Sequence, residues 1–236
     1  MALDLEVKYY GHATFGLTTP GGKRVIIDPW IDGNPACPDE AKPVDGLDLM
    51  LITHGHFDHV ADAAALCQRF EPTVVAIHEI ARWLELQGVS NTIGMNKGGT
   101  VPVDGLELTM THAVHSSSTE QDGSLVYLGE AAGFVIGLEN GRKIYFSGDT
   151  AVFGDMKLIA ELHAPELAFL PIGSHYVMSP QEASLATRML GVQTVVPMHF
   201  GTFPALTGTP EAYEKLVSDI NGLKVETMKP GEIRTL

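Results

Sequence analysis

Three histidines and an aspartate fall within the six positions from His54 to His59, in the stretch THGHFDH. Three imidazoles beside a carboxylate repel one another when protonated and pack poorly in a core, whereas both groups are common ligands of zinc, iron and manganese. In an extended loop, His54 and His56 project to the same side and can bind one cation. Asp58 and His59 then face a neighbouring position, where the next helix is expected to begin. The spacing therefore predicts a metal site rather than a solvated histidine-rich loop.

Three further candidate ligands lie at the ends of predicted strands. The alternation in LELTMTHAVHSSS predicts a strand on which His112 and His115 point to opposite faces. We expect His115, at the strand end, to be the ligand and His112, in phase with the apolar residues, to lie in the core. Asp149 ends the apolar strand IYFSGDT, where a buried carboxylate is costly unless it is paired, bound to a metal or used as a helix N-cap. His199 ends the strand TVVPMH before a glycine turn.

An internal repeat relates the two halves of the chain, about residues 1–118 and 119–236. The stretch YYGHATFGLTTPGGKRVIIDPW resembles YLGEAAGFVIGLENGRKIYFSGDT, DLMLIT resembles ELAFLP, and TVVAIH resembles TVVPMH, in the same order along both halves. Three matches in order favour duplication over chance similarity between β-rich segments. No linker or low-complexity segment divides the sequence, so we expect one domain over residues 1–236 that contains two pseudo-repeats.

Each repeat is expected to contain a hairpin followed by alternating strands and helices. The hairpins turn at Gly21-Gly22 and at Asn140-Gly141. The apolar runs LDLMLIT and ELAFLPIG suit strands that are buried on both faces. Helices are predicted over VADAAALCQRF, over SPQEASLATRML with Ser179 as its N-cap, and over TPEAYEKLVSDI. These elements predict an α/β fold, a four-layer αββα sandwich of two pseudo-duplicated halves.

The other histidines have weaker signals. His175 follows the strand AFLPIG in the region that the repeat equates with THGHFDH, so we expect it at the same rim, where it supports a ligand or transfers a proton. His12, in the strand YYGHATF, fits a core position, a supporting contact or a direct role. His78 precedes a helical stretch without other ligands and is predicted to be structural. His163 ends a polar helix and is predicted to be solvated.

The amino-acid composition restricts the cellular compartments and the binding partners that are compatible with the sequence. The chain has 236 residues, 44% of them hydrophobic, and a formal net charge of −14, which argues against nucleic acid as the general partner. No apolar run approaches the roughly 18 residues of a membrane span, and the start MALDLEVKYYGH carries acidic residues where a signal peptide would be basic. The two cysteines, Cys37 and Cys67, make neither a disulfide framework nor a thiolate zinc site. We therefore expect a cytoplasmic protein with a small-molecule substrate and no membrane span, and assembly into a homo-oligomer stays open.

The ordered motifs resemble those of a known family. THGHFDH, then AVHSSS, FSGDT and PMHFGT are similar to the successive motifs of the metallo-β-lactamase superfamily, and this resemblance covers nearly the whole chain. The stretches YYGHATF, IDPW and HFGTFP are further similar to a branch of small metal-dependent hydrolases related to ascorbate-6-phosphate lactonase and N-acyl-phosphatidylethanolamine phospholipase D. The resemblance implies the same duplicated αββα fold.

The resemblance also implies how the ligands divide between two divalent cations. The first cation would be held by His54, His56 and His115, the second by Asp58, His59 and His199, with Asp149 bridging. Zinc is the favoured metal, with manganese, nickel and iron as alternatives. No cysteine occupies a ligand position, which argues against antibiotic hydrolysis. His56 stands where flavodiiron oxygen reductases usually carry glutamate, which argues against redox chemistry.

The resulting hypothesis is a metal-dependent hydrolase. Hydroxide generated between two cations would cleave an ester-like bond, such as that of a lactone or a phosphodiester. Asp58 could orient the water, and His175 could protonate the leaving group. The loops after His199 and after Asp28, residues 201–206 and 30–38, are expected to wall the pocket with apolar side chains. The alternatives are a non-enzymatic metal-binding domain and a nuclease of the same superfamily.

Overall fold

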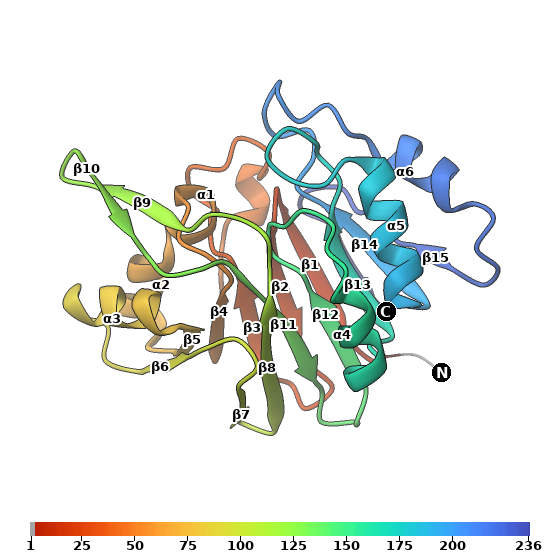
Figure 1. Ribbon diagram of the computed structural model, residues 1–236. Helices are drawn as coiled ribbons and strands as arrows, with labels where there is room; N and C mark the ends of the chain where they lie inside the picture. The colour runs from red at the N-terminus through yellow and green to blue at the C-terminus, as the bar shows by residue number, and fades with distance from the viewer. Residues whose placement is uncertain (1–2) are drawn as a thin grey trace.

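In the computed structural model, which describes residues 3–236, two seven-stranded sheets pack face to face (Figure 1). The first sheet contains, in spatial order, β16 (Ile233–Thr235), β1 (Glu6–Gly11), β2 (Thr14–Thr18), β3 (Arg24–Ile27), β4 (Leu49–Ile52), β5 (Thr73–Ile77) and β6 (Thr92–Met95). The second sheet contains, in spatial order, β15 (Lys224–Val225), β14 (Thr194–Met198), β13 (Leu167–Pro171), β12 (Lys143–Phe146), β11 (Ala132–Gly137), β8 (Leu106–His112) and β7 (Thr100–Val103). A separate two-stranded ribbon is formed by β9 (Ser118–Gln121) and β10 (Ser124–Tyr127).

The order and sense of the strands repeat between the two sheets. In the first sheet β1, β2 and β3 are antiparallel neighbours, whereas β3, β4, β5 and β6 run parallel. In the second sheet β8, β11 and β12 are antiparallel, and β12, β13, β14 and β15 run parallel. The division of the sheets does not fall at residue 118, because β7 and β8 precede it and β8 pairs with β11. Since β16 also returns to β1, neither sheet is built from one sequence half alone.

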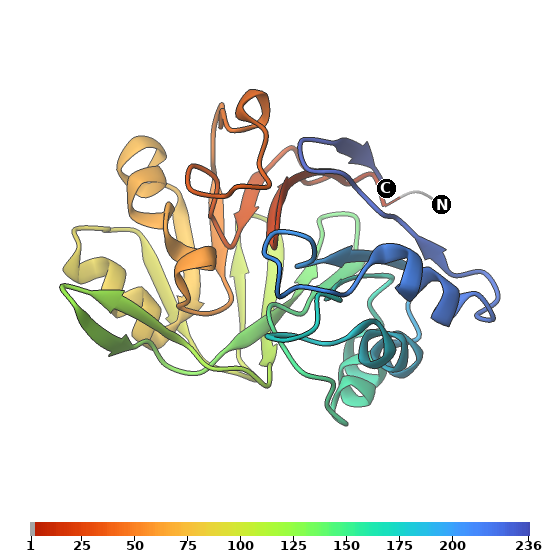
Figure 2. The same ribbon diagram turned by 90° about the horizontal axis from the view of Figure 1, so that it is seen from above.

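Helices cover the outer faces of the two sheets (Figure 2). Beside the first sheet lie α1 (Phe57–Val60), α2 (Ala63–Phe70), α3 (His78–Leu86) and a short 3-10 helix, η1 (Asp39–Ala41). Against the second sheet pack α4 (Met156–His163), α5 (Pro180–Leu190) and α6 (Pro210–Val217). This arrangement confirms the predicted αββα sandwich. Within residues 3–236, no helix has the length and apolar character needed to cross a membrane.

Local signals in the sequence correspond to local structure. Both predicted hairpins are present, as the antiparallel pairs β2–β3 and β11–β12. At the start of α5, the Ser179 hydroxyl accepts a hydrogen bond from the Glu182 amide, and the Glu182 carboxylate accepts one from the Ser179 amide. This reciprocal capping satisfies amides that a helix start leaves without partners, which explains why α5 begins there.

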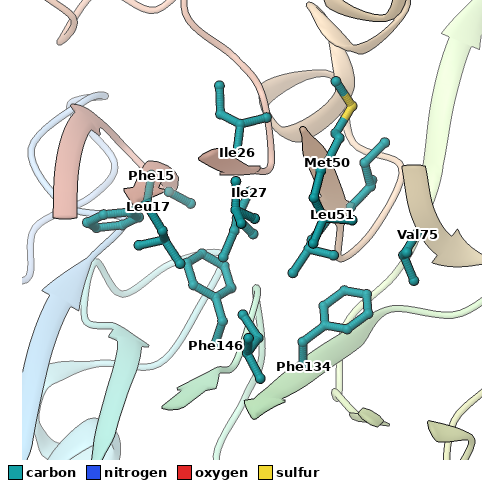
Figure 3. Close-up of a cluster of buried hydrophobic side chains, with 14 of the residues drawn as sticks. Phe15, Leu17, Ile26, Ile27, Met50, Leu51, Val75, Phe134 and Phe146 are labelled. Atoms are coloured by element: carbon teal, nitrogen blue, oxygen red, sulfur yellow. The ribbon is translucent and has the colours of Figure 1, made fainter. Parts of the chain in front are cut away.

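The inner faces of the two sheets form the main core (Figure 3). Phe15, Ile27 and Leu51 of the first sheet lie on the side that faces Phe134 and Phe146 of the second. The ring centroids of Phe15 and Phe146 are 6.0 Å apart, and all five side chains are fully buried. Burial of each side chain of this size contributes about 1.5–3 kcal/mol to folding. The packing fixes the spacing of the two sheets and therefore of the residues at their strand ends.

The structure corrects one expectation for β8. Thr109 and Thr111 are buried along with the apolar residues of this strand, so both of its faces are covered. His112, the last residue of β8, is exposed rather than part of the core, and its Nδ1 lies 3.1 Å from Nζ of Lys97. The alternation of apolar residues predicted this strand correctly. It does not show how far along the strand the covering layers extend.

Candidate metal centre

Most of the predicted ligands meet at the carboxyl ends of parallel strands, and His115 joins them from the loop after β8, whose two neighbours are antiparallel. His54 follows β4, and the short helix α1 then carries Asp58 and His59. Asp149 follows β12, and His199 follows β14. The carboxyl ends of parallel strands are the edge at which α/β folds gather functional side chains. The two sheets therefore contribute ligands to one location.

The first cluster consists of His54, His56 and His115, which each offer a ring nitrogen within 4.8 Å of the others. Nδ1 of His56 lies 3.1 Å from Nε2 of His54 and 3.3 Å from Nε2 of His115. The Thr53 hydroxyl lies 3.0 Å from Nδ1 of His54, which leaves the opposite nitrogen of that ring for the cluster. Three convergent imidazoles are a suitable ligand set for one divalent cation.

The second cluster consists of His12, Asp58, His59 and His199, whose ligand atoms also lie within 4.8 Å of one another. It contains the three residues predicted for a second cation and adds His12. Nδ1 of His59 lies 2.8 Å from Oδ2 of Asp28, outside the cluster, so His59 presents Nε2 to the other members.

Asp149 lies between the two clusters. Its Oδ2 is 3.9 Å from Nε2 of His54 and 3.7 Å from Nε2 of His115 in the first cluster. The same oxygen is 3.4 Å from Nε2 of His59 and 3.0 Å from Nε2 of His199 in the second. Oδ1 of Asp149, Nε2 of His59 and Nδ1 of His199 are buried without a hydrogen-bond partner among the described residues. Because buried polar atoms rarely remain unpaired, this donor set fits bound cations.

Burial and neighbouring groups set the protonation of the ligands. Burial, assisted by nearby His59, lowers the pKa of His54 well below its usual value, and burial lowers the pKa of the other two imidazoles of the first cluster. Burial alone would raise the pKa of Asp149, but His199 and His59 outweigh it and hold this pKa well below the usual value. Burial opposes the charge of His59, yet Asp149 and Asp28 raise its pKa well above the usual value. Most ligands are thus in the form that binds metal, and a cation would displace the proton of His59.

His12 orients Asp58. The His12 ring is fully buried, with Nε2 3.0 Å from Oδ2 of Asp58 and Nδ1 3.0 Å from the Thr202 hydroxyl. Burial, together with His199, lowers the pKa of His12 to about 4, although Asp58 opposes this shift. Burial would raise the pKa of Asp58, but the hydrogen bond with His12 and the nearby His59 lower it to about 2. A neutral imidazole therefore donates to a carboxylate, and among the roles left open for His12 the geometry favours a supporting contact.

Asp28 supports the centre although the ligand motifs did not identify it. The carboxylate is fully buried and accepts hydrogen bonds from the Thr53 amide at 2.7 Å and the Thr53 hydroxyl at 2.6 Å. Its contact with His59 then fixes which nitrogen of that ring faces the cluster. A signal was present in the sequence, because Asp28 ends an apolar strand as Asp149 does, and the internal repeat aligns the two runs.

Besides His112, three histidines stay outside both clusters. His175, after β13, is exposed, and its ring centroid lies 4.3 Å from that of Tyr176. His78 is the exposed first residue of α3, and His163 is the half-buried last residue of α4. The proton-transfer role of His175 therefore stays a prediction.

Three site residues have a left-handed backbone conformation. The φ angles are +59° at His12, +51° at Asp28 and +56° at His199. Such angles are uncommon for residues other than glycine. They cost about 1–3 kcal/mol each and persist only where the surrounding structure imposes them. The His199 amide donates to the His12 carbonyl at 2.7 Å, which joins a loop of the first sheet to a strand end of the second. Strained backbone of this kind concentrates at functional sites.

A cavity of about 960 Å³ opens onto both clusters. Its wall includes His56 and His115 of the first cluster, Asp58 and His199 of the second, and Asp149 between them. Concave sites of this size with a few convergent polar groups are typical of small-molecule binding.

The cavity walls agree only in part with the expectation from sequence. Residues 203–205 line the cavity, as predicted for the loop after His199. The prediction that residues 30–38 wall the cavity is wrong, because none of these residues lines it. Trp30 is instead buried behind the wall, where its ring stacks on that of Phe203 with centroids 5.8 Å apart. The rest of the wall is contributed by the β9–β10 ribbon together with Phe57, Ser116 and Tyr176.

The two-sheet sandwich, with one histidine cluster and one histidine–carboxylate cluster at its strand ends, is typical of metal-binding α/β proteins. Residues 23–200 match the family model of the beta-lactamase superfamily domain. The chain therefore belongs to the metallo-β-lactamase superfamily.

Named relatives and a solved structure support this assignment over the full length. The chain is 53% identical over 229 residues to a "UPF0173 metal-dependent hydrolase" of Rubrobacter xylanophilus, covering 96% of this chain and 95% of the relative. It is 53% identical over 230 residues to a protein of the same description from Solibacter usitatus, covering 97% and 98%. The structure of Igni18, a metallo hydrolase from Ignicoccus hospitalis, superposes with a TM-score of 0.88 at 37% identity, covering 98% of both chains. The protein is thus a metal-dependent hydrolase.

Proposed function

We propose that the protein uses two divalent cations to hydrolyse an ester-like bond in a small molecule. The first cluster would hold one cation, Asp58, His59 and His199 would hold the other, and Asp149 would bridge them. The position of Asp149 carries this proposal, because four imidazole nitrogens lie within 3.9 Å of its Oδ2 while its Oδ1 has no hydrogen-bond partner within residues 3–236. Nitrogen and carboxylate donors without thiolate favour zinc, and they also suit manganese, nickel or iron.

The residues of the chain hold and orient this centre. When bound, the cations would acidify a water to supply a hydroxide nucleophile and would stabilise the oxyanion of the transition state. Asp28 keeps His59 in the tautomer and orientation that a ligand needs. Asp58 lines the cavity and is oriented by His12, so it is placed to align the attacking water.

For the leaving group, we retain His175 as a proposed proton donor. Its ring contacts Tyr176, which lines the cavity, so His175 borders the cavity mouth. A His175→Ala variant with full metal content and reduced kcat would support the role. Unchanged kcat would remove His175 from the mechanism.

The cavity favours a lactone or a related ester over a nucleic acid. Among the described residues, no lysine or arginine lines it, and the chain has a formal net charge of −14. Binding of a nucleic acid depends on cationic contacts with its phosphates. The nuclease alternative is therefore the weaker of the two hydrolytic functions.

A substrate screen with metal analysis tests the proposed function. Purified protein loaded with zinc, manganese or nickel is assayed on lactones, phosphodiesters and thioesters, with His56→Ala as the blank. We expect about two cations per chain, turnover in at least one ester-like class, and loss of both in His56→Ala. A single cation per chain in the active protein would contradict the bridged pair, and undiminished turnover by His56→Ala would contradict the site.

We also propose a cytoplasmic location. Cys37 and Cys67 are both buried free thiols. A reducing compartment keeps such thiols free, which supports this placement.

A further inference from the structure

The side chains that line the cavity above the metal centre can discriminate among ester-like substrates. Building on the proposed function, we propose that it selects uncharged esters with a hydrophobic group, which packs against the β9–β10 ribbon and residues 203–205. We call these two segments, together with Phe57 and Tyr176, the apolar seat.

One face of the β9–β10 ribbon is turned toward the cavity. Ser118 pairs with Tyr127 and Glu120 pairs with Leu125, so these four side chains share one face of the ribbon. Three of them, Ser118, Glu120 and Leu125, line the cavity, and Thr119 of the opposite face is the one other ribbon residue among the described residues that does so. Leu125 is 78% exposed, so its side chain is available to a ligand.

The opposite face of the ribbon is anchored to the body of the protein. Nε1 of Trp83, on α3, donates to Oε1 of Gln121 at 2.8 Å. Val126 and Trp83 pack, partly buried, against the main core. Because an isolated two-stranded ribbon is marginally stable in water, this anchoring is what holds Leu125 over the cavity.

Aromatic side chains face the ribbon from the other walls. Phe57 and Tyr176 line the cavity and are 58% and 57% exposed, and Phe203 lines it beside them. The Trp30 ring lies behind two of them, with centroids 5.6 Å from Phe57 and 5.8 Å from Phe203. Exposed apolar side chains gathered around a polar centre are typical of a ligand-binding surface.

The charges that line the cavity are carboxylates, together with histidine rings of the metal centre. Asp58, Glu120 and Asp149 lie in the wall, and no lysine or arginine does so among residues 3–236. An anionic group on the substrate, away from the reacting bond, would therefore find no partner and would be repelled by Glu120. The seat accordingly favours an uncharged substrate body.

The size of the cavity sets the expected selectivity. A volume of about 960 Å³ is near the upper end of the roughly 300–1,000 Å³ found for small-molecule sites, so the seat has room for an acyl chain or an aryl group. Complete burial of one methylene favours binding about fourfold. Because an acyl chain at an open mouth is only partly buried, a smaller factor per methylene is expected.

The test compares p-nitrophenyl acetate, butyrate and hexanoate on the zinc-loaded full chain. These esters share one leaving group and differ only in the length of the apolar chain. We expect kcat/KM to rise about tenfold from acetate to hexanoate, and p-nitrophenyl hemisuccinate, which is anionic, to react more slowly than the butyrate. Leu125→Ser and Phe203→Ala should each reduce the hexanoate-to-acetate ratio about threefold or more.

Leu86→Ser is the matched control, because Leu86 is 73% exposed on α3 and does not line the cavity. This variant should keep the wild-type ratio. A flat chain-length profile in the wild type, or equal ratios in Leu125→Ser and Leu86→Ser, would overturn the apolar seat. Absence of turnover on every ester and lactone in the zinc, manganese and nickel forms would instead overturn the proposed function. In that case the apolar seat is tested by calorimetric measurement of N-octylacetamide binding. Leu125→Ser should weaken this binding about tenfold, and Leu86→Ser should leave it unchanged.

Discussion

Asp28 acts on the metal centre from inside the protein rather than from the cavity. Its carboxylate accepts two hydrogen bonds from Thr53 and faces Nδ1 of His59 at 2.8 Å. Because it is fully buried, it cannot contact a substrate. Its contribution is the orientation of His59, a proposed ligand, and contacts of this kind change metal affinity or activity about 10–100-fold.

We expect Asp28→Asn to bind the second cation about 10–100-fold more weakly than the wild type. Asparagine keeps the size of the side chain but puts an amide nitrogen where Thr53 or His59 requires an acceptor. Competition with a chelator measures the affinity. Asp48→Asn is the control, because Asp48 lies at the opposite end of β4 and contacts Arg24 instead. Equal affinities in the two variants would contradict the role of Asp28.

His12→Ala should lower kcat about 10–100-fold with a smaller change in KM. The substitution removes the donor to Asp58, and His12 itself does not line the cavity. His12→Gln can place an amide donor near the position of Nε2, so it should recover part of the loss. Steady-state kinetics are measured beside the metal content of each variant. A wild-type kcat in His12→Ala would show that catalysis does not depend on the orientation of Asp58 by His12.

Strand ends present the ligands, and the turn after β12 shows how a glycine makes this possible. Gly148 has a φ of +60°, and a Cβ at this position would lie 2.8 Å from the Ala132 carbonyl oxygen and 2.8 Å from Cβ of Thr53. Glycine therefore satisfies both the backbone angle and the close approach. The chain can turn sharply here and place Asp149 between the clusters.

Two glycine-to-alanine substitutions separate the energetic cost of steric crowding by an added Cβ from the cost of a positive φ angle. Gly141, in the β11–β12 hairpin, has a φ of +79°, and a Cβ there would meet no atom within 4 Å. Gly141→Ala should cost about 1 kcal/mol of unfolding free energy from the angle alone. Gly148→Ala should cost about 3 kcal/mol or more and reduce the metal content, because the added Cβ displaces Asp149. Urea unfolding measures both costs, and equal values would contradict the crowding.

Elements with local signals could be predicted from the sequence, whereas features set by distant contacts could not. The cap of α5 at Ser179 and the hairpin turns depend on neighbouring residues, and both were predicted correctly. The loop 30–38 was predicted to wall the pocket, and only the distant contact of Trp30 with Phe203 shows that the Trp30 ring lies behind the wall instead. Likewise, the sequence does not reveal which face of the β9–β10 ribbon turns to the cavity, because the contact of Trp83 with Gln121 decides it.

The candidate ligands could be selected because most of them end or follow an apolar strand. The sandwich then brings those strand ends together, so all seven lie in or between the two clusters. Asp28 has the same signal as Asp149 but forms no motif with neighbouring ligand-type residues, and its role depends on contacts with Thr53 and His59. The division of the seven between two cations stays a prediction.

At the scale of the whole molecule, the core and the metal centre both join the two sheets. Phe15 of the first sheet packs on Phe146 and Phe169 of the second. Asp149 and His199, which follow strands of the second sheet, meet the histidines that follow β4 of the first. Neither sheet can be exposed without opening the shared core, which supports the expectation of one domain over residues 1–236.

Unfolding should accordingly occur in a single cooperative transition. The two tryptophans, Trp30 and Trp83, lie in the first half of the chain and contact Phe203 and Gln121 of the second, so their fluorescence reports on contacts between the halves. Far-ultraviolet circular dichroism reports on helices and strands of both halves. We expect the two urea titrations to coincide within error. Separate midpoints would show that the pseudo-repeats unfold as independent units.

Removal of the cations should destabilise both halves equally. A cation present at a hundredfold excess over its Kd stabilises the folded state by about 2.7 kcal/mol, which corresponds to about 5–10 °C in Tm for a chain of this length. Because the ligands come from both sheets, a chelator should shift the fluorescence and circular dichroism transitions by the same amount. In His56→Ala, which lacks one ligand of the first cluster, the chelator should produce a smaller shift. A shift of one transition without the other would contradict a centre shared between the sheets.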